Sequence, residues 1–152
     1  VQDGRKVRLV FAGDGPYRAE IAMRCPEAVL LGMCTHQQLA EIYPSADLFL
    51  FPSLTETFGN VTLEALASGT PVLAFACAAA RDLLQPGRNG WLVASGDDLG
   101  YVGQARQIGQ DVHALQALRP CTAQSVASQG WEQIVGAVEA ALRQTLARTA
   151  GA

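Results

Sequence analysis

Short continuous apolar runs recur along the chain, each followed by a segment with helical periodicity, and this alternation constrains the fold most. The runs barely alternate polar with apolar residues, which is typical of strands buried on both faces of a parallel sheet. The expected strands cover residues 8–12, 28–31, 47–51, 72–75 and 91–93. Strands that alternate with helices predict an α/β fold with a Rossmann-like, doubly wound parallel sheet.

Helical patterns fill the segments between these strands and the whole C-terminal part. Asn60 suits the N-cap of one helix, which Gly69 and Pro71 would end. In the C-terminal part, Pro120 must bend or divide the helix in which it stands. The expected helices cover residues 17–24, 37–43, 60–68, 79–84, 98–108, 112–128 and 131–147.

The composition supports a single domain over residues 1–152. With 152 residues and 49% hydrophobic side chains, the chain can bury one sizeable core but hardly two. The net charge of −3 and the scattered basic residues argue against a nucleic-acid role. The longest apolar run, at residues 71–80, is too short to cross a bilayer. The four cysteines contain no Cys-x-x-Cys pair, so they suggest neither a zinc site nor a redox motif.

The segment 54–71, LTETFGNVTLEALASGTP, carries two glutamates around the start of an expected helix. The first-turn amides at Asn60 and Val61 are free to bind a phosphate. Glu56 and Glu64 flank that place, where carboxylates accept hydrogen bonds from hydroxyl donors such as those of sugars. Taken singly, Glu64 could simply favour a helix N-terminus and Glu56 could be a solvated loop residue. The pair, with its glycine turn, favours a sugar-nucleotide site.

A glycine turn, Gly13-Asp-Gly15-Pro, follows the first expected strand. Its glycines would allow a ligand to approach the backbone closely. The turn is not a full Gly-x-Gly-x-x-Gly fingerprint, because Arg18 stands three residues after Gly15. On its own it is equally consistent with a plain tight turn.

Together these motifs resemble the C-terminal domain of the family-4 retaining glycosyltransferases (glycosyl transferases group 1), which have the two-domain GT-B fold. The resemblance covers roughly residues 8–98. It is carried by the Gly-x-Gly-Pro turn, ADLFLFPS at 46–53, the two glutamates with seven residues between them, ASGTP at 67–71 and NGWLV at 89–93. Within it, residues 55–62 are similar to bacterial α-mannosyltransferases and glycolipid-type members.

The resemblance implies a role for each residue of these motifs. Glu56 would be the catalytic residue, contacting hydroxyls of the donor sugar and stabilising the oxocarbenium-like centre. Glu64 would accept hydrogen bonds from the nucleotide ribose. The other substrate-binding residues would be Phe58, Gly59, Asn60 and Val61 around the sugar and diphosphate, Gly13 and Gly15 at the cleft floor, and Met33 against the base.

The activity implied by the resemblance is transfer of a hexose from GDP-mannose or a UDP-sugar to a glycan or lipid acceptor, with no cofactor and no catalytic metal. The chain would be the donor-nucleotide-binding domain, lacking its first strand and helix and the N-terminal acceptor domain. The missing part would supply cations for the diphosphate, so the isolated chain is expected to be inactive. A cytoplasmic location is expected, with peripheral attachment of the full-length enzyme to the membrane as an option.

Two alternatives remain open at this point. One is a non-catalytic nucleotide-sugar-binding or interaction module. The other is a fragment of a GT-B sugar-nucleotide epimerase, which would use its carboxylates and a histidine for proton chemistry. His36 precedes an expected helix, where a surface or capping-region residue is the simpler interpretation.

Overall fold

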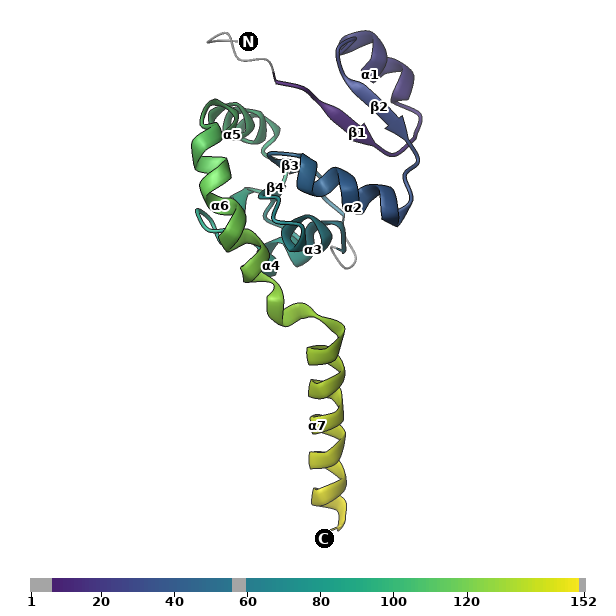
Figure 1. The fold of residues 1–152 in the computed structure, drawn as a ribbon, viewed down its shortest axis with the longest axis vertical. Coiled ribbons are helices and arrows are strands. Elements are labelled where there is room, and N and C mark those ends of the chain that lie inside the picture. The colour runs from purple at the N-terminus through teal and green to yellow at the C-terminus, as the bar shows by residue number, and fades with distance from the viewer. Residues whose placement is uncertain (1–6, 56–59, 151–152) are drawn as a thin grey trace.

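The computed structural model describes residues 7–55 and 60–150, in which strands and helices alternate (Figure 1). The alternating part comprises β1 (Val10–Ala12), α1 (Arg18–Arg24), β2 (Val29–Gly32), α2 (His36–Ser45), β3 (Phe49–Phe51), α3 (Asn60–Ala67), β4 (Val72–Phe75), α4 (Ala78–Leu83) and β5 (Gly90–Val93). The C-terminal part comprises α5 (Asp98–Gln110), α6 (Val112–Ser125), the 3-10 turn η1 (Ala127–Gln129) and α7 (Trp131–Ala150). Each expected strand and helix is present, which confirms the α/β class.

Two details of the expected helices differ from the structure. Asn60 is the first helical residue of α3. The expectation that Asn60 is the N-cap, which is the residue before the helix, is therefore wrong. Pro120 lies within α6, which continues undivided from Val112 to Ser125. A proline removes one backbone donor from the helix, and here that loss does not end the helix.

The strands form two parallel sheets, one of β1 and β2 and one with the order β3-β4-β5. No strand pairing joins the two sheets within the described residues. The expectation that all strands are covered on both faces is therefore wrong for β1, whose residues are all exposed, including Val10 at 48%. Among residues 7–55 and 60–150, β1 pairs with β2 alone, so no described strand lies along its other edge.

The core is built around β4, the central strand of the larger sheet, whose residues are all buried. One face of β4 presents Val72 and Ala74 to a cluster that includes Leu66 of α3. The opposite face presents Leu73 and Phe75 to α5 and α6. This alternation follows from the twofold repeat of a strand and places α3 and α5 on opposite faces of the sheet.

Helix α2 is fastened to the rest of the domain at its C-terminal end. The last carbonyls of a helix have no partner inside it. Here the Thr70 hydroxyl donates to the Tyr43 carbonyl, and the Arg119 guanidinium donates to the carbonyls of Pro44 (2.5 Å) and Ala46 (2.7 Å). Thr70, which follows α3, and Arg119 of α6 thus hold the C-terminal end of α2 in place.

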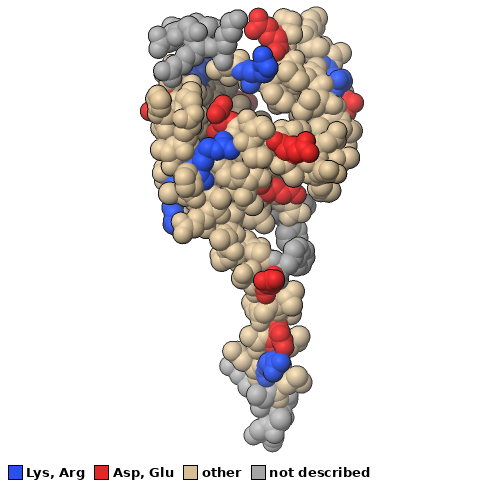
Figure 2. Space-filling view, viewed as in Figure 1, with Lys and Arg blue, Asp and Glu red and all other residues tan. Residues whose placement is uncertain are grey.

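The last helix, α7, extends away from the sheets (Figure 1). Large apolar side chains exposed on the described part of α7 include Ile134, Val135, Val138, Leu142 and Leu146. On the face seen in Figure 2, basic and acidic side chains are interspersed and form no single-sign patch. Within the described part of the chain, none of the helices has both the length and the apolar character that a membrane span requires.

Candidate functional site

The glycine turn lies at the carboxyl end of β1, where the sequence places it. The Gly13 amide donates to the Gly32 carbonyl at 2.7 Å, so the ends of β1 and β2 lie side by side. Gly13 has a φ of 127°, which favours glycine over residues with a side chain. A Cβ added at Gly13 or Gly15 would meet no other atom within 4 Å. The backbone of this turn is thus open to a ligand.

Met33 follows β2 directly and leads into α2. Its side chain is exposed, at 78%. Two residues later, Thr35 caps α2 in a reciprocal arrangement: its hydroxyl accepts from the Gln38 amide at 3.2 Å, and its own amide donates to the Gln38 side chain at 2.8 Å. This capping box fixes the start of α2, three residues after Met33.

Glu64 lies one turn inside α3 and shares a helix face with Asn60. Its side chain is 38% exposed, and its two oxygens meet two residues of α2. Oε1 is 3.9 Å from Nδ1 of His36, and Oε2 accepts a hydrogen bond from the Tyr43 hydroxyl at 3.4 Å. His36, three residues after Met33, thus lies close to the Glu64 carboxylate, which is predicted to bind ribose.

Tyr43 is buried, at 6% exposure, while His36 is almost fully exposed. Burial first, and then the charge and the hydrogen bond of Glu64, raise the pKa of Tyr43 to about 12. The phenol therefore keeps the proton that it donates to the carboxylate to a higher pH than an ordinary tyrosine would. The interpretation of His36 as a surface residue at a helix start is confirmed.

Six of the nine predicted site residues lie in the described part of the chain: Gly13, Gly15, Met33, Asn60, Val61 and Glu64. The bond between Gly13 and Gly32 joins the glycine turn to the residue before Met33, and Glu64 lies 3.9 Å from His36, three residues after Met33. The predicted catalytic residue Glu56, with Phe58 and Gly59, lies outside the described residues. Sequence reasoning missed Tyr43, although its spacing of two helical turns from His36 places both on one face of α2.

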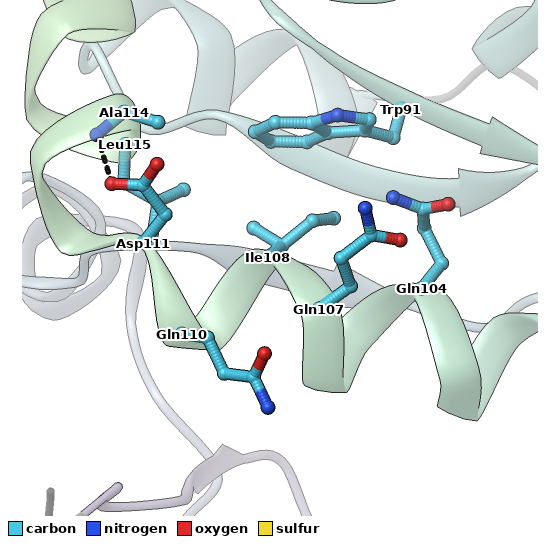
Figure 3. A pocket seen from close by; sticks show the side chains of 8 residues that line it. All are labelled: Trp91, Gln104, Gln107, Ile108, Gln110, Asp111, Ala114 and Leu115. Carbon is cyan, nitrogen blue, oxygen red and sulfur yellow. Dashed lines mark hydrogen bonds between the residues drawn. The ribbon is translucent and has the colours of Figure 1, made fainter. Parts of the chain in front are cut away.

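A groove of about 440 Å³ lies elsewhere, between β5, α5 and α6. Figure 3 shows the ring of Trp91 facing Ile108 across this groove, while Asp111 accepts from the Ala114 amide at 2.9 Å. None of the six described site residues lines it. In the described ranges, no three His, Cys, Asp or Glu side chains gather closely enough to hold a metal ion.

The parallel strands and flanking helices define a Rossmann-like α/β domain. In such domains ligands bind at the carboxyl ends of the strands, and here that end carries a glycine turn and the partly exposed carboxylate of Glu64. The chain belongs to the glycosyl transferases group 1 family, whose model matches residues 1–111. The resemblance found in the sequence is thereby confirmed.

Two relatives with transferase names illustrate the match. The chain is 37% identical over 138 residues to a GDP-mannose-dependent alpha-mannosyltransferase of Mycobacterium tuberculosis, covering 88% of this chain and 36% of the relative. It is also 37% identical over 113 residues to a D-inositol 3-phosphate glycosyltransferase of Catenulispora acidiphila, covering 74% of this chain and 27% of the relative. The chain thus spans well under half the length of these relatives.

The fold is shared with solved glycosyltransferase structures. A sucrose-phosphate synthase from Thermosynechococcus elongatus superposes with a TM-score of 0.77 at 27% identity, covering 93% of this chain and 38% of that one. A pneumococcal O-GlcNAc transferase in complex with UDP and GlcNAc superposes with a TM-score of 0.72 at 23% identity, covering 91% and 29%. These likenesses confirm the expected GT-B type of α/β fold.

Proposed function

We propose that the chain is the donor-nucleotide-binding domain of a retaining glycosyltransferase, which transfers a hexose from a nucleoside-diphosphate sugar to a glycan or lipid acceptor. The observation that carries the proposal is the half-exposed carboxylate of Glu64, held on α3 beside the segment that follows β2. The name of the mycobacterial relative makes GDP-mannose the first donor to test, and UDP-sugars the second. Transferase names among the relatives favour group transfer over the epimerase alternative.

Each described site residue has a place in this proposal. Glu64 accepts hydrogen bonds from the ribose hydroxyls. The first amides of α3, at Asn60 and Val61, have no partner inside the helix and bind the diphosphate. Gly13 and Gly15 offer open backbone at the floor of the site, and exposed Met33 lies against the base.

Three predicted residues complete the proposal without structural description. Glu56 remains the proposed catalytic residue, acting on the sugar hydroxyls and the anomeric centre. Phe58 and Gly59 remain proposed contacts of the sugar and diphosphate. All three stand between β3 and α3, so they precede the helix that carries Glu64.

The split between the two sheets supports the proposal that the chain lacks the first strand of its domain. A doubly wound sheet with the order 3-2-1-4-5-6 has its first strand at the centre. If β1 and β2 are its second and third strands and β3 to β5 its fourth to sixth, the centre falls between β1 and β3. We propose that the full-length protein supplies a strand there, with the cations that neutralise the diphosphate, and an N-terminal domain for the acceptor. The isolated chain would then bind donor weakly and transfer poorly.

The proposed location follows from the same assignment. Nucleoside-diphosphate sugars are the proposed substrates, and the full-length enzyme would meet them in the cytoplasm. Lipid acceptors would bring it to the cytoplasmic face of the membrane.

Calorimetric titration with GDP-mannose and UDP-glucose tests the proposal. We expect one of them to bind, and Glu64→Gln to weaken binding about tenfold or more, since hydrogen bonds to charged groups are the stronger ones. Glu41→Gln is the matched control, because Glu41 is an exposed glutamate on α2, the helix next to α3. Failure of both nucleotide sugars to bind, or equal affinity in the Glu64 variant, would overturn the proposal.

A further inference from the structure

The side chain of Tyr43 reaches from α2 to the carboxylate of Glu64. The two residues stand 21 positions apart, and the Tyr43 hydroxyl donates to Oε2 of Glu64 at 3.4 Å. Tyr43 is buried, at 6% exposure, whereas the Glu64 side chain is 38% exposed. A buried donor thus contacts a carboxylate that is partly exposed to solvent.

The position of Tyr43 is fixed by several elements at once. Its ring packs edge-on against the ring of Phe49 in β3, with centroids 5.5 Å apart. Its carbonyl accepts from the Thr70 hydroxyl, and Arg119 donates to the carbonyls of Pro44 and Ala46 at the end of α2. Tyr43 therefore has little freedom to move with Glu64, and the hydrogen bond restrains the carboxylate.

A long acidic side chain on a helix surface would otherwise sample several rotamers, and a ligand would have to select one of them. A hydrogen bond from a buried and packed donor removes part of that freedom before the ligand arrives. One oxygen of Glu64 is engaged by Tyr43, while the other is only within 3.9 Å of an exposed imidazole. The carboxylate is thus presented to solvent in a restricted orientation.

We propose that Tyr43 is a positioning residue of the donor site, which holds the Glu64 carboxylate in the orientation that accepts hydrogen bonds from the ribose hydroxyls of a nucleoside diphosphate. This inference rests on the proposed function and adds a residue to it. The charge and the hydrogen bond of Glu64 are among the causes that raise the pKa of Tyr43 to about 12, which agrees with an interaction between the two side chains. Tyr43 touches no substrate in this role and acts through Glu64.

The test compares nucleotides with and without ribose hydroxyls. Calorimetry gives the affinities of the wild type and of Tyr43→Phe for GDP, for UDP and for their 2′,3′-dideoxy forms. We expect Tyr43→Phe to weaken binding of the ribonucleotide about three- to tenfold, in keeping with the loss of one hydrogen bond. Binding of the dideoxy form should be unchanged, because it has no hydroxyl to donate to Glu64.

Tyr101→Phe is the matched control. Tyr101 is also buried, at 7% exposure, and its hydroxyl donates to the Leu73 carbonyl at 2.7 Å in the other core cluster. A merely structural loss of a buried tyrosine hydroxyl should therefore be visible in Tyr101→Phe as lower stability. It should leave the preference for ribonucleotide over dideoxynucleotide as in the wild type.

A second variant tests whether Tyr43 acts through Glu64. In the Glu64→Gln background, Tyr43→Phe should cause no further loss of ribonucleotide affinity. Equal losses for ribo and dideoxy forms, or an additional loss in that background, would overturn the positioning role while leaving the proposed function intact. Absence of nucleotide binding by the wild type would overturn both.

Discussion

Arg119 in α6 donates a 2.7 Å hydrogen bond to the carbonyl of Ala46, 73 residues earlier, at the end of α2. The same guanidinium reaches the Pro44 carbonyl at 2.5 Å. Because α2 carries His36 and Tyr43, which contact the carboxylate of Glu64, the C-terminal helices help to determine the geometry of the candidate site. α6 also packs on α3, so the two helices that meet at Glu64 share one support.

Replacement of Arg119 should weaken the attachment of α2 to α6. We expect Arg119→Met to lower the free energy of unfolding by about 1–2 kcal/mol, because two carbonyls lose their donor. Arg119→Lys should restore only part of the loss, since an ammonium cannot reproduce the planar fork. Urea unfolding measures both, and Arg106→Met, at an exposed position of α5, is the control. A loss of equal size in the control would count against the role of Arg119.

Two buried threonines should respond to the same substitution in opposite ways. Thr62 and Thr122 are both fully buried, but the Thr62 hydroxyl has no hydrogen-bond partner within the described residues. The Thr122 hydroxyl donates to the Leu118 carbonyl at 2.9 Å. Thr62→Val should therefore stabilise the chain by up to about 1 kcal/mol, and Thr122→Val should destabilise it by a similar amount. Chemical denaturation of the two variants side by side checks the sign of each change.

Much of the fold follows from local sequence patterns. The four residues of β4 were predicted without error, because a continuous apolar run is bounded there by Pro71 and the helix that follows. The exposure of β1 could not be predicted in this way. A strand is buried by its neighbours in the sheet, and no property of the run itself tells which neighbours are present.

The candidate site also has parts that local sequence patterns predict and parts that they do not. Gly13 and Glu64 are predicted as site residues from their motifs, since each stands at a fixed offset from a strand end or helix start. The hydrogen bond between Tyr43 and Glu64 joins residues 21 positions apart on different helices. Such a contact depends on how α2 packs on α3, which no periodicity within either helix encodes.

Two matched valines test the proposal that a further strand lies beside β1 in the full-length protein. Val72 of β4 is fully buried, whereas Val10 of β1 is 48% exposed. In this chain we expect Val72→Ala to cost about 2 kcal/mol and Val10→Ala well under about 1 kcal/mol. In a version restored to full length, the cost of Val10→Ala should rise toward that of Val72→Ala, because a strand added beside β1 would bury it. An unchanged cost in the longer protein would argue against the proposed central strand.

The raised pKa of Tyr43 predicts a pH dependence in the alkaline range. Its folded-state pKa is about 12 and the ordinary value is 10.0. Above the ordinary value the unfolded chain loses this proton first, so the contribution to stability is complete below about pH 10 and falls as the pH rises toward 12. Tyr43→Phe should therefore flatten the loss of stability between these two values, whereas Tyr17→Phe, at an exposed position, should not.

Glu64→Gln should lower the pKa of Tyr43 by removing the negative charge beside the phenol. The pKa should nevertheless stay above the ordinary value, because burial is the largest cause of the shift and the substitution leaves Tyr43 buried. Ultraviolet titration of tyrosinate, with Tyr43→Phe to assign the signal, measures both values. A Tyr43 pKa that does not change in the Glu64 variant would show that the phenol and the carboxylate are not coupled in solution.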